Sequence, residues 1–309
     1  MKTICIVASC LNEKGNIKIL YERFKNVFIQ LPGYDFSLLL IDNFSTDGTR
    51  DEISELCNSD RRVRAIFNSR NFGHIRSPYH SFLHSEGDAV FTTVSDLQVE
   101  PEVIVEFIKK WENGSDIVIG LKKDDQRLSL LSLSSKFYYY LINKLSDTPQ
   151  RRNFIGIGLY DRKAVEAIKT IKDPYPYFRG LIFEVGFKVT EVFYQNRDRE
   201  RGVTKNNFFT LYDLAMLGIC THSKVPLRVA VIVGFGTAIL SLLMGIFYLF
   251  YKIIYWNSFR IGMAPLVIGL FFLGSVQLIF LGIIGEYIGF ILTKVQNRPL
   301  VFEEKRINF

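Results

Sequence analysis

The amino-acid sequence predicts an α/β domain with a mostly parallel sheet, followed by a juxtamembrane amphipathic helix and a two-helix transmembrane hairpin. The first observation is that short apolar runs alternate with segments of helical periodicity in the first half of the chain, as in parallel α/β sheets. The second is a change at about Lys224, where mixed charged and apolar residues give way to long apolar runs. The third is that two of these runs are long enough to cross a bilayer.

The strands and helices of the first domain can be placed from their periodicity. Strands are expected at Ile4–Ser9, Phe36–Ile41, Val63–Phe67, Ala89–Thr93 and Asp116–Ile119. Helices are expected at Asn16–Gln30, from about Thr49 to about Cys57, and at Pro101–Glu112. No GxGxxG or GxxxxGK[ST] loop accompanies these elements, which argues against a dinucleotide-binding or P-loop protein.

Two carboxylates stand directly after apolar strands of this predicted sheet. Asp42 follows one strand, and Asp96 follows another. Ligands of parallel α/β sheets bind at the carboxyl ends of the strands, so both side chains are expected at one crevice. Either residue can instead serve a turn or cap a helix, and Asp47, in a Ser-Thr-Asp-Gly-Thr turn, is the better candidate for a plain cap. The pair favours a polar ligand, often one with a metal.

The predicted spans are Val229–Tyr251 and Ile261–Gly285. The first carries no charge, and the link between them holds aromatic residues such as Trp256, as expected where a hairpin turns at the water interface. A buried core hairpin is the alternative, which the length of both runs disfavours. Before the spans, Phe208–Ile219 has apolar residues at helical spacing, and we expect an amphipathic helix on the membrane face. The alternative is a helix packed on the globular domain.

Basic residues flank the hairpin on both sides, namely Lys224, Arg228, Lys294 and Arg298. Two spans bring both flanks to one side, and basic flanks favour the cytoplasm. Lys252 and Arg260 in the loop weaken this bias, so the expectation rests mainly on the absence of a signal peptide. We expect a multi-pass protein of the inner (cytoplasmic) membrane with a cytoplasmic globular domain. The segments are 1–206 (globular domain), 207–228 (amphipathic helix and linker), 229–290 (spans, about 229–251 and 261–285) and 291–309 (cytoplasmic tail).

The net charge of +7 suits anionic lipid head groups or phosphates, and by itself it suits nucleic acid equally well. His80 and His84 have the i, i+4 spacing of metal ligands. Because no acidic partner accompanies them in the manner of an HExxH motif, the sequence disfavours a metal site there. Glycines in both spans would let the helices pack closely against each other or against another copy of the chain.

Short motifs then follow one another in a fixed order: Asn12-Glu13, Asp42-Asn43-Phe44-Ser45-Thr46-Asp47-Gly48-Thr49, Arg70-Asn71-Phe72-Gly73, Asp96-Leu97-Gln98 with Pro101-Glu102, Arg199-x-x-Gly202-x-Thr204-Lys205, Gly285-Glu286-Tyr287-Ile288-Gly289 and Gln296-Asn297-Arg298-Pro299. This order, with two C-terminal spans, resembles the inverting GT-A-fold (Rossmann-like, family 2) glycosyltransferases. It is most similar to their polyprenyl-phosphate branch, which includes dolichyl-phosphate mannose synthases and bacterial undecaprenyl-phosphate glucosyltransferases. The resemblance covers nearly the whole chain.

The resemblance implies roles for the residues that match. In this family, the Glu after the first strand and the strand-end Asp contact the nucleotide base, which implies Glu13 and Asp42. Further donor-binding residues implied by the motifs are Asn12, Asp47, Arg70 and Asp96. The DxDLQ box of the family holds a divalent metal, Mg²⁺ or Mn²⁺, and the diphosphate, which implies Asp96 and Gln98 as the metal-binding and catalytic residues. Carboxylate and amide oxygens are hard ligands that suit such an ion.

A second set of residues is implied to contact the phosphate of a lipid acceptor: Lys122, Arg127, Ser135, Arg199, Thr204 and Lys205. The match at the first three is loose. For the last three, the alternative is a basic juxtamembrane stretch attracted to anionic lipid.

The sequence departs from the family pattern at three places. Val94 replaces the usual first Asp of the metal box, Asn43 replaces the second Asp of the DDGS turn, and Gly156-Ile157-Gly158 replaces a segment that often carries an Asp. Asp161 nearby fits a helix cap better than a base. A lipid phosphate is already anionic near pH 7 and needs no strong protein base, so the missing carboxylate favours a phosphate acceptor.

The sequence therefore predicts a metal-dependent inverting enzyme that moves a hexose from a UDP-sugar to polyprenyl (undecaprenyl) phosphate at the membrane, with no nucleic-acid partner. Two alternatives stay open. The acceptor can be a saccharide already built on a lipid carrier, as in capsule or O-antigen assembly. The chain can also be a catalytically silent nucleotide-binding scaffold, which the Val94 and Gly156 departures motivate.

Overall fold

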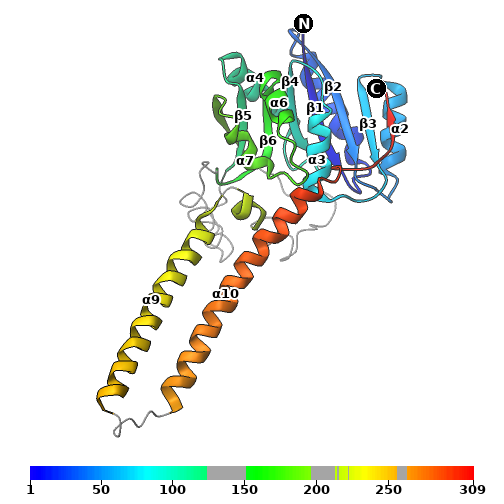
Figure 1. Cartoon of the computed structure of the whole chain (residues 1–309). Coiled ribbons are helices and arrows are strands. Elements are labelled where there is room, and N and C mark those ends of the chain that lie inside the picture. Colours follow the sequence, from blue (N-terminus) through cyan, green and yellow to red (C-terminus); the bar gives the residue numbers. More distant parts are fainter. Residues whose placement is uncertain (124–150, 196–212, 214–215, 222, 256–262) are drawn as a thin grey trace.

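The computed structural model of the chain describes residues 1–123, 151–195, 213, 216–221, 223–255 and 263–309. These residues form a globular domain around one sheet and two long helices that leave the domain side by side (Figure 1). The sheet has eight strands in the order β7-β5-β6-β4-β1-β2-β3-β8. The strands are β1 (Lys2–Cys10), β2 (Tyr34–Asp42), β3 (Val63–Asn68), β4 (Ala89–Val94), β5 (Ile117–Lys122), β6 (Phe154–Asp161), β7 (Val189–Tyr194) and β8 (Glu303–Ile307).

The centre of the sheet is parallel, as predicted. Strands β3, β2, β1 and β4 run in one direction, whereas β6 and β8 are antiparallel to their neighbours. The helices of the domain are α1 (Asn16–Ile29), α2 (Thr49–Ser59), α3 (Gly73–Leu83), a 3₁₀ turn η1 (Pro101–Val103) with α4 (Ile104–Glu112), α6 (Arg162–Thr170) and α7 (Phe178–Glu184). The strands and helices predicted from periodicity are all present, with ends that differ by a few residues.

The core lies on both faces of the sheet, which explains why its strands are almost continuously apolar. Along β1, Ile4, Ile6 and Ala8 belong to the core on one face, which α1, α2 and α4 cover. Cys5 and Val7 point to the other face, which α3, α6 and α7 cover. The two clusters fix the register of β1, because a shift by one residue would exchange the side chains of both faces.

The last strand of the sheet comes from the end of the chain. β8 pairs antiparallel with β3, with Ile307 opposite Ala65 and Lys305 opposite Phe67. The Asn308 side chain then donates hydrogen bonds to the carbonyls of Cys57 and Val63, at 2.7 and 2.8 Å. The prediction of a separate tail at 291–309 differs from the structure: residues up to Gln296 continue a helix, and 303–307 cover the edge of β3.

The two long helices are α9 (Val225–Ile254) and α10 (Met263–Gln296), and both are long and apolar enough to cross a membrane. At about 1.5 Å per residue they exceed the roughly 30 Å of a hydrocarbon core. Their large apolar side chains are mostly exposed, so the alternative of a buried core hairpin does not hold. The start of α9 and the end of α10 both lie beside the globular domain (Figure 1).

An ion pair and hydrogen bonds attach these helices to the rest of the described chain. Lys294 of α10 forms an ion pair of 3.1 Å with the buried carboxylate of Asp173. The Tyr287 hydroxyl donates to the Ser223 carbonyl at 2.7 Å. Arg76 of α3 donates to the Pro299 carbonyl, just beyond α10, at 3.1 Å. Of the amphipathic helix predicted at Phe208–Ile219, residues 216–219 are helical, and most of the remainder lies outside the described residues.

Candidate functional site

The carboxyl ends of the parallel strands lie on the side of the domain that faces the long helices. β1 starts at the N-terminus, at the far end of the domain, and runs toward the end from which α9 and α10 leave (Figure 1). The register aligns the neighbouring strand ends, because Cys10 lies opposite Asp42 and Ser9 opposite Val94. The loops after β2, β1 and β4 therefore emerge next to one another, which is the arrangement predicted for the ligand crevice.

The loops after β1 and β2 are joined through Asn12. Its backbone N–H donates to the Ser45 hydroxyl at 2.9 Å, and its side-chain carbonyl accepts from the Thr46 N–H at 2.8 Å. Asn12 has a φ of 58°, in the left-handed region that Asn tolerates better than most residues. The two loops behave as one unit, and the exposed Asn12 lies on its surface.

Asp47 and Glu13 strengthen the same junction. Asp47 accepts from the Thr49 N–H at 3.0 Å and from the Lys14 N–H at 3.2 Å. Burial would raise the pKa of Asp47, but hydrogen bonds from the Thr49 hydroxyl and N–H outweigh it and lower the pKa below its ordinary value. The Glu13 N–H donates to the Thr49 hydroxyl at 2.9 Å, and the Glu13 carboxylate accepts from Asn16 at 2.7 Å. The cap prediction for Asp47 differs from the structure, because Gly48 is the N-cap residue of α2 and Asp47 precedes it. Asp47 nevertheless holds the start of α2 through its hydrogen bonds with Thr49.

Asp42 lies beneath this pair of loops, with its carboxylate fully buried. It accepts from the Phe44 N–H at 3.1 Å and from the Ser45 N–H at 3.2 Å. The Arg50 Nε lies 3.0 Å from one carboxylate oxygen as an ion pair, although its N–H is not aligned for a hydrogen bond. The contact of Asp42 with a nucleotide base stays a prediction; in this structure the carboxylate holds the backbone of the loop.

Asn43 is the centre of a buried polar network that links β2, β3 and α3. Its side-chain N–H groups donate to the Asn71 side-chain oxygen at 2.9 Å and to the Gly73 carbonyl at 3.2 Å. Its side-chain oxygen accepts from the Asn68 amide at 3.1 Å and from the Phe72 N–H at 2.9 Å. A carboxylate has no N–H to donate. The network therefore gives a physical reason for Asn where the related pattern has Asp.

The turn after β4 carries the predicted metal ligands. Asp96 is 7% exposed, and its carboxylate accepts from the Gln98 N–H at 3.2 Å. Leu97 between them has a φ of 58°, which is uncommon for Leu and costs conformational energy. The Val94 side chain packs against the hydrophobic core, so this position makes apolar contacts where the related pattern has a carboxylate. Asp96 and Gln98 offer hard oxygen atoms that fit a divalent ion, if the diphosphate supplies further ligands.

The structure describes two further predicted site residues. Lys122 ends β5 at the same edge of the sheet, where its backbone exchanges hydrogen bonds with Asn153 at 3.1 Å. Arg70 is exposed, and its guanidinium lies 4.2 Å from the centre of the Phe72 ring. The other acceptor-site predictions fall outside the described residues, namely Arg127, Ser135, Arg199, Thr204 and Lys205.

The segment that replaces the usual Asp offers no base in the structure. Gly156 has a φ of 103°, and its carbonyl accepts from the Thr92 hydroxyl at 2.7 Å. Asp161 caps α6 by accepting from the Lys163 N–H at 3.0 Å, and it also accepts from the Trp111 indole at 2.7 Å. The prediction that Asp161 is a helix cap is confirmed.

His80 of α3 and His84, the C-cap of that helix, do have an acidic neighbour, which the sequence reasoning missed. His80, His84 and Glu303 of β8 place possible ligand atoms within 4.8 Å of one another. The His80 Nε2 lies 2.5 Å from a Glu303 carboxylate oxygen, and Arg306 contacts both oxygens of that carboxylate. Because Arg306 already supplies the positive charge, we interpret the group as an ion-pair cluster that fastens β8 to α3.

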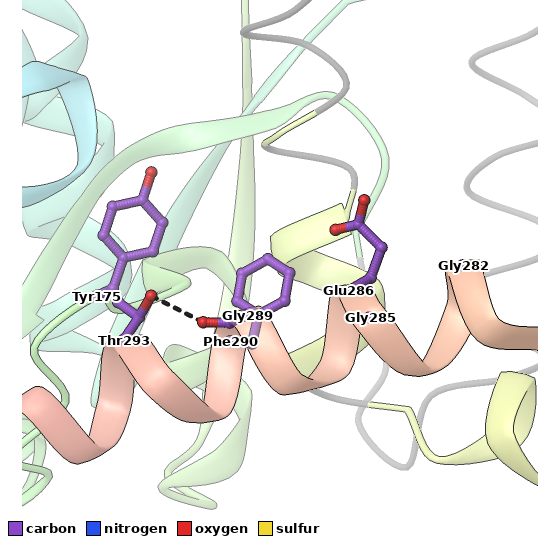
Figure 2. Close-up of a pocket in the computed structure, with 7 residues that line it drawn as sticks. All are labelled: Tyr175, Gly282, Gly285, Glu286, Gly289, Phe290 and Thr293. Carbon is purple, nitrogen blue, oxygen red and sulfur yellow. Dashed lines mark hydrogen bonds between the residues drawn. The ribbon is translucent and has the colours of Figure 1, made fainter.

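A cavity of about 440 Å³ lies where α10 passes the domain (Figure 2). The described residues that line it are Tyr175 and six residues of α10: Gly282, Gly285, Glu286, Gly289, Phe290 and Thr293. The three glycines have no side chain, so the bare backbone of α10 forms part of the cavity wall. Of the predicted site residues that the structure describes, none lines this cavity.

The sequence matches the model of glycosyl transferase family 2 over residues 5–169. The chain belongs to this family. As a family 2 glycosyltransferase, it is a sugar-transferring enzyme. The matched region runs from β1 through α6 and includes Asp42, Asp96 and the loops described above. The resemblance to GT-A-fold glycosyltransferases is therefore confirmed, as is the predicted mostly parallel α/β domain followed by two apolar helices that are long enough to cross a membrane.

Known relatives of this glycosyltransferase extend the likeness through α9 and α10. The SfII prophage-derived bactoprenol glucosyl transferase of Shigella flexneri is 34% identical over 299 residues, which cover 96% of both chains. The putative glycosyltransferase CsbB of Bacillus subtilis is 34% identical, over 96% of this chain and 89% of its own. Among solved structures, glucosyl-3-phosphoglycerate synthase from Mycobacterium tuberculosis with UDP has a TM-score of 0.47 and 16% identity, covering 71% of this chain and 78% of that one.

Proposed function

We propose that the chain transfers a hexose, with glucose as the first candidate, from a UDP-sugar to polyprenyl (undecaprenyl) phosphate at the cytoplasmic face of the membrane. The observation that carries the proposal is the likeness to a bactoprenol glucosyl transferase over 96% of both chains, apolar helices included. The direction of the sheet supports it, since the strand ends with the predicted site face those helices (Figure 1). An acceptor anchored in the bilayer would approach from that side.

The reaction is a single displacement at the anomeric carbon of the sugar. A phosphate oxygen of the lipid forms a bond to that carbon, while the bond to the UDP oxygen breaks and UDP leaves with the electron pair. The configuration at the carbon inverts, and the product is a phosphodiester. Because the phosphate monoester is largely dianionic near pH 7, with a second pKa of about 6, the attacking oxygen needs no protein base. This suits the absence of a carboxylate at Gly156.

The residues at the strand ends would bind and orient the donor. The joined loops of Asn12, Glu13 and Asp47 form a preorganised rim for the nucleoside, and the exposed guanidinium of Arg70 can pair with phosphate oxygens. Asp96 and Gln98 would hold a divalent ion, Mg²⁺ or Mn²⁺, which when bound neutralises charge on the diphosphate leaving group. Lys122 lies at the same edge, where a cation favours an anionic acceptor. Holding both substrates at one edge supplies much of the rate enhancement.

The test uses the full-length protein in lipid nanodiscs with undecaprenyl phosphate and a panel of UDP-hexoses. Mass spectrometry should find a hexosyl phospholipid from at least one donor. Folded protein that yields no product from any donor would refute the proposal, and product only on a lipid-linked saccharide would assign the alternative acceptor. The variant Asp96→Ala should lose both turnover and metal-dependent UDP binding, whereas Glu100→Ala, four residues away, should keep both.

A further inference from the structure

Arg50 connects the buried carboxylate of the candidate site to the last strand of the chain. It lies in the first turn of α2, and its Nε is 3.0 Å from Asp42. One Nη atom donates to the Glu304 carboxylate of β8 at 2.7 Å and lies 3.4 Å from the Asn68 carbonyl. The guanidinium therefore lies between two carboxylates, one fully buried and one about half exposed.

The placement of this guanidinium decides whether the Asp42 carboxylate has a counter-charge. A buried carboxylate is costly unless it is paired and hydrogen-bonded. Arg50 also lies over two aromatic rings, 5.2 Å from the centre of Phe67 and 5.8 Å from that of Phe44. A long arginine side chain loses rotamer freedom when it is held in this way, and Glu304 supplies the fixed partner at its outer end.

Asp42 in turn holds the backbone of the loop after β2, where residues predicted to bind the donor lie. Its carboxylate accepts from the N–H groups of Phe44 and Ser45. Phe44 is held with a φ of 73°, a strained conformation for a bulky residue. The Ser45 hydroxyl accepts from the Asn12 N–H, so a shift of Asp42 would move the loops after both β1 and β2.

We propose that Glu304 is a positioning residue for the donor nucleotide: through Arg50 it fixes Asp42 and hence the loops that hold the nucleoside. The inference rests on the proposed function, since it assumes a nucleotide donor at these loops. It assigns a second role to β8, which both covers the edge of β3 and completes the donor side of the site.

The neighbouring residue of β8 provides a matched control. Glu303 pairs with His80 and Arg306, whereas Glu304 pairs with Arg50. The substitutions Glu303→Ala and Glu304→Ala remove the same charge from adjacent positions of one strand. Both loosen the attachment of β8, but only the second releases Arg50.

The experiment compares the full-length wild type with the two variants in detergent. Calorimetry gives the dissociation constant of UDP with metal, transfer kinetics give KM for the donor and kcat, and thermal unfolding gives Tm. For Glu304→Ala we expect about a five-fold weaker UDP affinity and a matching rise in donor KM, with kcat and acceptor KM nearly unchanged. This corresponds to about 1 kcal/mol, the upper range for a partly exposed ion pair. Glu304→Asp should restore the affinity to within two-fold.

Glu303→Ala should lower Tm at least as much as Glu304→Ala, while UDP affinity stays within two-fold of the wild type. Equal losses of UDP affinity in both variants would overturn the inference and reduce Glu304 to a general attachment of β8. Unchanged affinity in Glu304→Ala would overturn it as well. A wild type that binds no UDP would instead refute the donor assignment of the proposed function. The same titration therefore distinguishes a failure of the proposed function from a failure of the inference about Glu304.

Discussion

Replacing Asn43 by Asp brings the sequence closer to the related DDGS pattern, and the structure predicts that the change is harmful. The side chain is 4% exposed and uses both of its ends. Its N–H groups donate to the Asn71 side-chain oxygen and to the Gly73 carbonyl, at 2.9 and 3.2 Å. In Asn43→Asp, a carboxylate oxygen would face these two acceptors, and both would lose their donor.

The size of the effect follows from the two lost donors. A buried polar group left without its partner costs about 1–3 kcal/mol, so two such groups and an added buried charge give at least about 3 kcal/mol. For a chain of this size, about 1 kcal/mol changes Tm by roughly 2–4 °C, so the expected drop is about 6–12 °C. Burial and the facing acceptors also raise the pKa of the new carboxyl. The Asn43→Asp variant is therefore most stable at low pH, where the new carboxyl is protonated, and it loses stability as the pH rises.

Thermal unfolding of the full-length protein in detergent, at two pH values, measures both effects. Asn71→Asp is the matched control, since the Asn71 side-chain oxygen only accepts, from Asn43 and from the Gly73 N–H at 2.8 Å. An aspartate still offers a carboxylate oxygen to both donors, and residue 71 is exposed, so the Tm of Asn71→Asp should stay within about 3 °C of the wild type. Equal stability of Asn43→Asp and the wild type would refute the donor role of the Asn43 amide.

Three further outcomes are expected. Asp96→Asn should lower transfer at least about 100-fold with Tm unchanged, measured with saturating donor and acceptor; activity near the wild-type level would remove Asp96 from the site. Hydrogen bonds from Arg306 lower the pKa of Glu303 from 4.5 to about 2, so this carboxylate stabilises the fold above about pH 4.5, and the stability is lost as the pH falls toward 2. The protection factors of the β8 amides in hydrogen exchange should fall over that range in the wild type but not in Glu303→Gln. Lys294→Met leaves the buried Asp173 carboxylate without its 3.1 Å partner and should lower Tm by several degrees, whereas an unchanged Tm would show that the pair contributes little.

The parallel centre of the sheet can be predicted from the sequence, because the strands there are buried on both faces and appear as continuous apolar runs. The sequence was not sufficient for β8, whose residues Glu-Glu-Lys-Arg-Ile have neither an apolar run nor a clear alternation. Such an edge strand is specified by its partner, here β3, and not by its own side chains. The long apolar runs of α9 and α10 could be predicted from the sequence, although α9 begins before its predicted span and α10 ends after its own.

The candidate site, too, could be predicted from the sequence only in part. Asp42 and Asp96 could be found because each follows an apolar strand, and position at a strand end is visible in a sequence. Arg50 and Asn43 act through contacts with Glu304, Asn68 and Asn71, which only the folded chain brings together. The distance in sequence between Arg50 and Glu304, 254 residues, excludes any local signal.

The return of β8 to the sheet has a consequence for the order in which the molecule is made. β3 is synthesised early, but its partner emerges only after α9 and α10, about 100 residues beyond β7. Between the end of β3 at Asn68 and the start of β8 at Glu303 lie about 235 residues. At roughly 5–20 residues per second, the edge of β3 waits roughly 10–50 s for its cover. An open strand edge is a site of mispairing during that time. Synthesis of the two long apolar helices thus precedes completion of the sheet, so the globular domain cannot close the edge of β3 before α9 and α10 have been made.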